Sequence, residues 1–362
     1  MKKLSLCLIV KNEENSLDDC LKNSKKYADE IIIVDTGSTD KTKEIAKKYT
    51  NKIFDFKWCD DFSKARNYSF SKATNEYIMW LDGDDIILEN DVNEIIKWKN
   101  NSENCDVLMC KYVVSYDDQF NSIFEYYRER IVKKSPQLCW QDRVHEVIVP
   151  HGKIIRNENI KIFHNKKQTN SSERNLNIYR DMKLKGEYFS PRNQFYFARE
   201  LYFNGYIAQA VQEFKKFLED EKGWVENKIE AHLNLAKCYC LQKEYDMALS
   251  SLYASFVYDL PRGEILYEIG NVYVEMQDFN RAIYWFKLAL SARPETEKGG
   301  FVNKDCITFL PALQLCYCYF KLGDNCYAFK YHKLSQKYRP KDAKVQHNEN
   351  YFKNLYTKKQ PN

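Results

Sequence analysis

The first 165 residues alternate short apolar runs with segments in which apolar residues recur every three or four positions. The apolar runs fit buried β-strands and lie at residues 4–10, 30–34, 52–56 and 77–81. The segments between them have helical spacing and lie at residues 15–27, 40–49 and 62–73. This order predicts an α/β domain whose mostly parallel sheet is covered by helices on both faces.

The pattern changes after residue 85. A helix is predicted near residues 91–98, and three β-rich stretches follow at residues 107–116, 123–132 and 154–163. Because these runs are not separated by helical segments, they predict antiparallel strands added to one edge of the sheet.

The second half of the chain repeats a different pattern. Small and apolar residues around Gly270 follow fixed offsets: Leu266, Ile269, Gly270, Tyr273, Ala282, Phe286, Ala289 and Pro294. Further copies centre on Ala198, Ala236 and Cys316, at spacings of 38, 34 and 46 residues. These offsets match the tetratricopeptide pattern of helix–turn–helix units that bury their faces by stacking. We therefore expect a first domain over residues 1–168, all-α repeats over 169–345, and a polar tail over 346–362.

Composition excludes several classes of protein. The 362 residues include 56 basic and 51 acidic ones, and the net charge of +5 is scattered, so a nucleic-acid partner is not expected. No apolar run reaches the roughly 18 residues that a membrane span needs. The apolar run after Met1 ends at Lys11 without a cleavage site, which favours a first strand over a signal peptide. Twelve cysteines without zinc-type spacing indicate reduced, packed thiols and a cytoplasmic protein.

Three carboxylates follow the fourth predicted strand, in the sequence Asp82-Gly83-Asp84-Asp85. Grouping that much negative charge at a strand end costs free energy unless a positive group lies there. A hard divalent cation that also holds a phosphorylated ligand is the usual occupant of such a site. For this motif taken alone, an acidic surface turn is the alternative.

Polar clusters also follow the earlier predicted strands, at residues 10–13, 34–40 and 61–67. The carboxyl ends of parallel strands share one edge of a sheet, so these clusters should converge on one crevice. Their carboxylates and Arg66 suit a nucleotide, although each cluster alone could merely cap a helix. No glycine-rich phosphate loop is present, which argues against dehydrogenases and kinases. The Asn12-Glu13-Glu14 segment lacks the glycine and lysine that a nucleotidyltransferase would place there.

Four segments together resemble the motifs of inverting family 2 glycosyltransferases, which have the GT-A fold. They are Ser5–Glu13, Val34–Asp40, Asp61–Asn67 and Trp80–Asp85. With the repeats, the chain resembles the bacterial branch of peptide S- and O-glycosyltransferases that are similar to the sublancin enzyme. The resemblance covers residues 1–165 by motif and the remainder by repeat architecture.

The resemblance implies roles for the residues at the strand ends. Asp35 would contact the nucleotide base, usually uracil, Arg66 would lie near the base or diphosphate, and Asp82 would face the ribose. The other residues implied to bind the donor are Val10, Asn12 and Glu13.

The resemblance also implies the ligands of Mg²⁺ or Mn²⁺. Asp84 would be the direct ligand, with Asp82 and the closing His164 as further candidates and Asp85 as a competing one. Glu146, in the segment Arg143-Val144-His145-Glu146, would act as the catalytic base beside His145. A purely structural role for His145 remains open.

The predicted function is metal-dependent, inverting transfer of a sugar from a nucleotide-sugar, most simply a UDP-sugar, to a peptide or protein side chain recognised by the repeats. A cell-envelope or lipid-linked glycan is the rival acceptor. A non-catalytic repeat scaffold with a decayed first domain is the rival class. The repeats could also mediate a homodimer.

Overall fold

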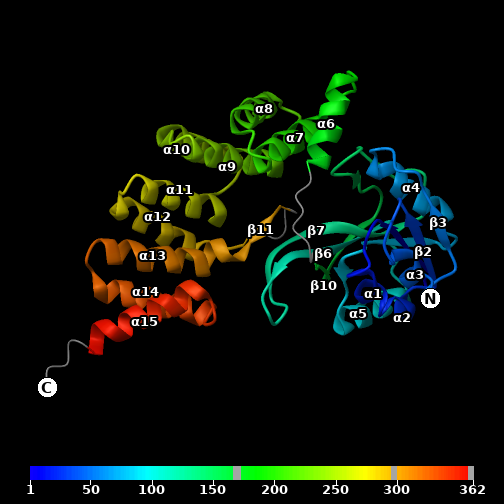
Figure 1. Ribbon diagram of the computed structural model, residues 1–362, viewed down its shortest axis with the longest axis horizontal. Helices are drawn as coiled ribbons and strands as arrows, with labels where there is room; N and C mark the ends of the chain where they lie inside the picture. The colour runs from blue at the N-terminus through cyan, green and yellow to red at the C-terminus, as the bar shows by residue number, and fades with distance from the viewer. Residues whose placement is uncertain (166–172, 295–299, 358–362) are drawn as a thin grey trace. The chain divides into compact units, whose positions relative to one another are not determined.

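The computed structural model describes residues 1–165, 173–294 and 300–357 (Figure 1). The chain divides into two compact units, Met1–Phe189 and Ser190–Asn362. This division falls later than residue 168, where the sequence suggested a boundary. Helix α6 (Arg174–Leu184) belongs to the first unit, where the Tyr179 hydroxyl donates a hydrogen bond to the Val144 carbonyl at 3.4 Å.

A mixed β-sheet forms the centre of the first unit. Its strands lie in the order β3-β2-β1-β4-β7-β6-β10-β5. Their bounds are β1 (Leu4–Val10), β2 (Glu30–Asp35), β3 (Ile53–Asp55), β4 (Tyr77–Asp82), β5 (Asp85–Ile86), β6 (Val107–Tyr116), β7 (Ser122–Lys133) and β10 (Ile154–His164). Strand β1 pairs in parallel with β2 and β4, and β2 pairs in parallel with β3, which confirms the predicted parallel half.

The added edge is only partly antiparallel. Strand β7 runs antiparallel to β4 and β6, as expected, but β10 pairs in parallel with β6, so the prediction of antiparallel strands is wrong for that pair. The reason is the connection before β10. A small antiparallel hairpin, β8 (Trp140–Gln141) with β9 (Val147–Ile148), lies in this connection, and the chain enters β10 in the same direction as β6.

Alternate residues of the central strands enter two different cores, as a sheet covered on both faces requires. On β4, Met79 belongs to one apolar cluster and Trp80 to the other. The helices of this unit are α1 (Leu17–Leu21), α2 (Ser24–Tyr27), α3 (Thr42–Ala46), α4 (Phe62–Lys72), α5 (Glu89–Asn100) and α6. The single helix predicted over residues 15–27 is thus two short ones.

The second unit consists of antiparallel helix pairs followed by a last helix. The pairs are α7 (Pro191–Phe203) with α8 (Ile207–Glu219), α9 (Val225–Leu241) with α10 (Tyr245–Ala254), α11 (Gly263–Glu275) with α12 (Phe279–Ser291), and α13 (Phe309–Lys321) with α14 (Asn325–Tyr338). The remaining elements are η1 (Ser255–Val257), β11 (Val302–Asn303), η2 (Lys304–Ile307) and α15 (Ala343–Thr357).

The repeat residues lie where the helices of a pair meet. A Cβ atom on Gly270 would lie 2.5 Å from the Phe286 ring, so only glycine lets α11 approach α12 this closely. Ala198, Ala236 and Cys316, the equivalent residues of the other copies, are buried as well. The tetratricopeptide-type fold is therefore confirmed for the second unit.

Residues 346–357, expected within a polar tail, continue helix α15. Val345 and Phe352 are 0% and 3% exposed, and their spacing of seven residues places both on one helix face. These two apolar side chains anchor the helix despite its polar composition. The rest of the expected tail, residues 358–362, lies outside the described residues.

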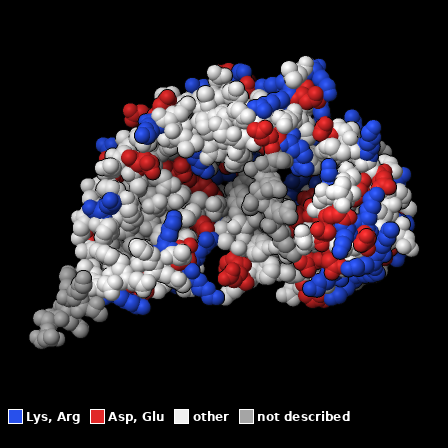
Figure 2. Space-filling view, in the orientation of Figure 1, with Lys and Arg blue, Asp and Glu red and all other residues white. Residues whose placement is uncertain are grey.

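The surface charge is mixed, as the nearly balanced numbers of acidic and basic residues lead one to expect. Acidic and basic side chains are interspersed on the visible face, and the helices of the second unit show wide areas without charge (Figure 2). All twelve cysteines are free thiols. Within the described ranges, no helix is both long enough and apolar enough to cross a bilayer.

Candidate active site

The strand ends singled out in the sequence lie side by side. In the register of the sheet, Asp35 of β2 pairs with Val10 of β1, and Asp82 of β4 pairs with Ile9 of β1. Adjacent strands are about 4.8 Å apart, so the Cα atoms of Asp35 and Asp82 are separated by about 10 Å. That distance is within the reach of one nucleotide.

Asp35 presents one carboxylate oxygen without a partner. Its side chain is 2% exposed, and Oδ1 accepts hydrogen bonds from the backbone N–H groups of Gly37 and Ser38, both at 2.9 Å. Oδ2 is buried and has no hydrogen-bond partner among the described residues. A buried acceptor without a donor costs free energy, so this oxygen fits a ligand that brings an N–H or O–H group.

Val10 and Asn12 hold the loop that follows β2. The Val10 carbonyl accepts from the Thr36 N–H at 2.9 Å, and Asn12 Oδ1 accepts from the Thr39 N–H at 2.8 Å. Asn12 adopts a φ of 56°, a left-handed conformation that asparagine tolerates better than most residues. Both residues therefore shape the rim of the site.

Glu13 packs directly against the glycine of the acidic turn. A Cβ atom on Gly83 would lie 2.8 Å from Glu13 Cγ, so the turn needs glycine here. Burial raises the pKa of Glu13, a hydrogen bond from Ser16 lowers it, and the negative charges of Asp84 and Asp82 raise it further. Glu13 thus belongs to the same concentration of negative charge.

Arg66 connects two of the candidate carboxylates. Its Nε donates to Glu146 Oε1 and its Nη2 to Asp82 Oδ1, both at 2.6 Å. The guanidinium carbon lies 4.8 Å from the Trp80 ring centroid and 4.7 Å from that of Trp140. The two neighbouring aromatic rings and the two carboxylates fix this side chain in one orientation.

The charges of this group stabilise one another. Burial opposes the charged form of Arg66, but the Asp82 and Glu146 carboxylates raise its pKa further above the usual range. Burial likewise opposes ionised Asp82, yet Arg66 and Arg130 lower the pKa of that carboxyl to about 2. Asp82 is therefore ionised and forms an ion pair with Arg66.

A second group, formed by Asp84, Asp85 and His164, has the geometry of a cation site. Their potential ligand atoms all lie within 4.8 Å of one another, and His164 Nδ1 is 3.4 Å from Asp84 Oδ1. Burial lowers the pKa of His164, but the two carboxylates raise it to about 10. Carboxylate and imidazole ligands suit Mn²⁺ and related divalent cations, so the donor set fits the predicted metal.

Asp82 and Asp85, both candidates for the metal, lie in different groups. Asp82 faces Arg66, whereas the competing candidate Asp85 lies with Asp84 and His164. Asp85 is fully buried, and its Oδ2 and Oδ1 accept from Arg130 Nη1 at 2.9 Å and from the Tyr112 hydroxyl at 3.0 Å. Asp85 is thus held rigidly beside the cation group.

The predicted catalytic segment lies in the turn between β8 and β9. Glu146 is largely buried and bonded to Arg66, while His145 has a φ of 52° and its ring stacks on Tyr179 at a centroid distance of 6.2 Å. Helix α4 fixes the hairpin, because Asn67 Nδ2 donates to the Trp140 carbonyl and Asn67 Oδ1 accepts from the Trp140 N–H, both at 2.9 Å. The structure therefore brings Glu146 to the Arg66 group, while the His145 ring stacks on Tyr179 of helix α6.

Sequence reasoning missed the arginines of β7. The Arg130 side chain is fully buried, with its guanidinium carbon 3.7 Å from the Trp80 ring centroid, and Arg128 Nη2 donates to the Glu146 carbonyl at 3.4 Å. A signal was present. Arg128, Glu129 and Arg130 are three consecutive charged residues inside a strand, and charged residues are rarely buried without partners.

The first unit combines a mostly parallel sheet with acidic groups at its strand ends, and comparison with known proteins shows which family it is similar to. Residues 5–163 match the family model described as glycosyl transferase family 2. This segment is therefore a family 2 glycosyl transferase domain.

Two relatives and one solved structure are each similar to part of the chain. It is 28% identical over 237 residues to the SPbeta prophage-derived glycosyltransferase SunS of Bacillus subtilis, covering 59% of this chain and 53% of SunS. It is 44% identical over 90 residues to the TPR repeat-containing protein Synpcc7942_0270 of Synechococcus elongatus, covering 25% and 22%. The chain thus spans about half or less of the length of these curated relatives. The thermophilic TPR protein TTC0263 of Thermus thermophilus aligns at 17% identity over 49% of this chain and 87% of its own, with a TM-score of 0.37.

Proposed function

We propose that this protein is a metal-dependent, inverting glycosyltransferase that moves a sugar from a UDP-sugar to a peptide or protein side chain. The observation that supports the proposal is that one compact unit, most of which matches family 2, holds the unpaired Asp35 oxygen, the Asp84–His164 group and the Arg66-bound Glu146. Each supplies one requirement of sugar transfer.

Asp35 would recognise the nucleotide base. Its free Oδ2 accepts from a ring N–H, which uracil offers and which gives the donor a fixed orientation. The loop held by Val10 and Asn12 would border the same base. Asp82, ionised and held by Arg66, retains a second oxygen that can accept from a ribose hydroxyl.

Asp84 and His164 would hold Mg²⁺ or Mn²⁺, with Asp85 beside them. Such a cation, when bound, offsets the charge on the departing nucleoside diphosphate. Arg130 and Tyr112 donate hydrogen bonds that fix the Asp85 side chain in place, so this part of the site is preorganised before any ligand enters.

Glu146 would take the acceptor's proton. Arg66 occupies Oε1, so we assign proton uptake to Oε2, which makes no hydrogen bond within the described ranges. As the proton moves to Oε2, the acceptor atom bonds to the anomeric carbon, and the bond from that carbon to the diphosphate oxygen breaks. One in-line displacement inverts the anomeric centre. Arg66 is the positioning residue for this step.

The acceptor proposal rests on the second unit. Stacked helix pairs form extended surfaces suited to peptides, which favours a peptide or protein acceptor over a cell-envelope or lipid-linked glycan. A non-catalytic scaffold would need none of the buried charge pairs that surround Trp80.

Isothermal titration of the full chain with UDP, with and without Mn²⁺, tests the proposal. We expect binding that depends on Mn²⁺ and that falls at least about tenfold in Asp84→Ala, because a bound cation links the carboxylate to the diphosphate. Asp118→Ala, which removes an exposed carboxylate from the turn between β6 and β7, is the matched control and should bind normally. Absence of UDP binding under both conditions would favour the scaffold.

A further inference from the structure

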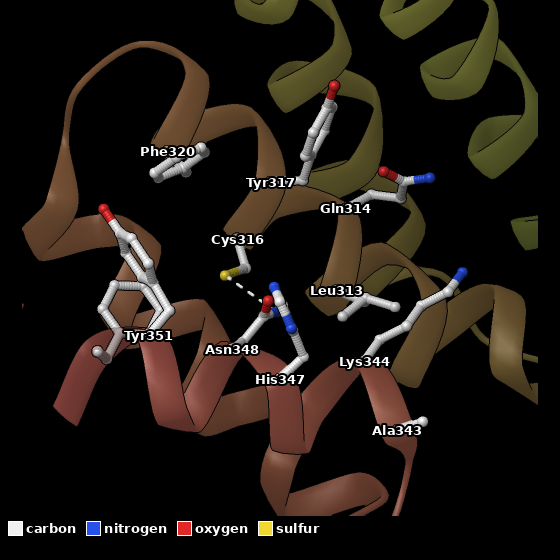
Figure 3. A pocket seen from close by; sticks show the side chains of 11 residues that line it. Leu313, Gln314, Cys316, Tyr317, Phe320, Ala343, Lys344, His347, Asn348 and Tyr351 are labelled. Carbon is white, nitrogen blue, oxygen red and sulfur yellow. Dashed lines mark hydrogen bonds between the residues drawn. The ribbon is translucent and has the colours of Figure 1, made fainter. Parts of the chain in front are cut away.

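A cavity of about 550 Å³ lies between helices α13 and α15 of the second unit (Figure 3). Side chains from both helices face each other across it. The lining residues are Leu313, Gln314, Cys316, Tyr317, Phe320, Ala343, Lys344, His347, Asn348, Tyr351 and Phe352. Its volume is within the range of ligand-binding cavities, about 300–1,000 Å³.

Three aromatic side chains of the lining are unusually exposed. Tyr317, Phe320 and Tyr351 are 42%, 43% and 39% exposed, and the rings of Phe320 and Tyr351 meet edge to face at a centroid distance of 5.3 Å. Aromatic rings gain the most from burial, and clustered exposed rings mark interaction sites. The cavity is therefore suited to an apolar side chain.

The cavity lining contains basic side chains and no acidic ones. Lys344 and His347, one turn apart on α15, are its ionisable basic groups, and none of the lining residues is acidic. Lys344 is exposed and its Nζ has no ion-pair partner among the described residues, so it remains available to an incoming carboxylate. The ligand complementary to this cavity is apolar with an acidic group beside it.

Two amide side chains border the aromatic surface. Asn348 Nδ2 donates to Cys316 Sγ at 3.8 Å, and Gln314 Nε2 donates to Asn271 Oδ1 at 3.4 Å. Sulfur is a weak acceptor and the second bond is long, so both amides can exchange these partners for stronger ones. The backbone of an extended peptide offers such donors and acceptors at regular intervals.

We propose that this cavity binds an extended peptide segment in which an apolar side chain is flanked by acidic residues. The ring cluster would take the apolar side chain, Lys344 and His347 the carboxylates, and Gln314 and Asn348 the backbone. The binding itself depends only on the second unit. That the bound segment belongs to the sugar acceptor rests on the proposed function.

Fluorescence anisotropy of the full chain with a fluorescein-labelled peptide, Gly-Ser-Asp-Phe-Asp-Ser-Gly, tests the site. We expect binding that weakens at least about tenfold when lysine replaces both aspartates or alanine replaces the phenylalanine. Ala343→Trp should abolish it, because Ala343 is an exposed lining residue and an indole there fills the cavity without disturbing the core.

Charge reversal sharpens the test. Lys344→Glu should weaken the aspartate peptide and strengthen the lysine peptide, whereas Lys337→Glu, at an exposed position of α14 outside the cavity, should change neither. UDP titration of the same variants reports on the first unit. Loss of peptide binding with UDP binding intact, or the reverse, therefore distinguishes the two proposals.

Three outcomes would overturn the inference. One is no peptide binding up to about 1 mM, the upper limit of a weak specific complex. Another is equal affinity for the aspartate and lysine peptides. The third is a wild-type dimer in sedimentation velocity that Ala343→Trp dissociates, since the cavity would then accommodate a second copy of the chain.

Discussion

The strand-end site of the first unit and the cavity of the second are built on opposite principles. Around Trp80, charged side chains are buried and paired, as Arg66 is with Asp82 and Glu146, and Arg130 with Asp85. Between α13 and α15, aromatic rings remain exposed and Lys344 lacks an ion-pair partner in the described structure. The first arrangement fixes its geometry before a ligand arrives, and the second leaves contacts to be completed by the ligand.

Buried ion pairs cost desolvation free energy, so their presence in the strand-end site and absence from the cavity lining need a physical reason. Removing two charges from water is repaid only when geometry and further hydrogen bonds are favourable. The Asp85 side of the Arg130–Asp85 pair meets this condition, because Tyr112 and the Asp82 N–H also donate to Asp85. On the Arg130 side, Nε and Nη2 are buried without a hydrogen-bond partner among the described residues, and the guanidinium packs on the Trp80 and Tyr112 rings instead. Such a group is useful where atoms must be held in accurate positions, as at a reacting centre. Recognition of a flexible peptide does not require it.

The largest effect should follow the loss of the assigned base. Glu146→Gln keeps the shape of the side chain but cannot accept the acceptor's proton, so we expect turnover to fall about 100-fold or more. UDP affinity should stay close to that of the wild type. Mass spectrometry of the glycosylated acceptor measures the first and titration the second. Turnover equal to that of the control Glu158→Gln, an exposed position on β10, would place the base elsewhere.

Breaking the buried pair should be the next largest effect. Arg130→Met leaves Asp85 without its main partner, and we expect unfolding free energy to fall by about 3–5 kcal/mol in urea titration. The double variant with Asp85→Asn should recover part of that loss, because the uncompensated charge is gone. If Arg130→Met were as stable as the wild type, the strand-end site would not depend on internal charge pairing.

Packing, rather than charge, should limit the second unit. Gly270→Ala places a Cβ atom 2.5 Å from the Phe286 ring, and overpacking of this kind costs about 1–3 kcal/mol. Thermal unfolding monitored by circular dichroism measures it. Phe286→Leu in the same chain supplies room and should offset much of the loss. A fully stable Gly270→Ala would mean that the helix pair can move apart at little cost.

The smallest expected effect is a difference between the two units in how their stability depends on pH. Burial and the nearby Lys228 lower the pKa of His232 on α9 from 6.5 to about 4, so the unfolded chain binds this proton more readily than the folded one. The contribution to stability is complete above pH 6.5 and is lost as the pH falls toward 4. Asp82, with its pKa lowered to about 2, contributes above its ordinary value near pH 4 and loses that contribution only below it.

Melting temperatures between pH 7 and 4 measure this difference. In His232→Gln the decline over that range should be smaller than in the wild type. The matched control is His347→Gln, at an exposed position of α15, whose melting temperature should follow the wild-type curve. Parallel curves for wild type and His232→Gln would show that the buried imidazole does not set the acid sensitivity of the second unit.

Much of the fold could be predicted from local patterns of apolar residues in the sequence. The β1, β2 and β4 strands and the helix pairs follow from apolar periodicity, which depends on neighbours in sequence. The direction of β10 did not, because it depends on the β8–β9 hairpin in the preceding connection. Helix α15 was missed because two apolar residues, Val345 and Phe352, carry its packing within a polar segment.

The sequence by itself determined which chemical groups end the strands of this protein and which small residues lie where paired helices meet. Both features depend only on the spacing of residues that are close together in the sequence. Only the tertiary structure decided how those groups are paired. Arg66 meets Glu146 across 80 residues of sequence, and Asp85 rather than Asp82 lies with Asp84 and His164. The physical reason is that strand register and burial select the partner of each charge, and neither is encoded by the residues next to it in the chain.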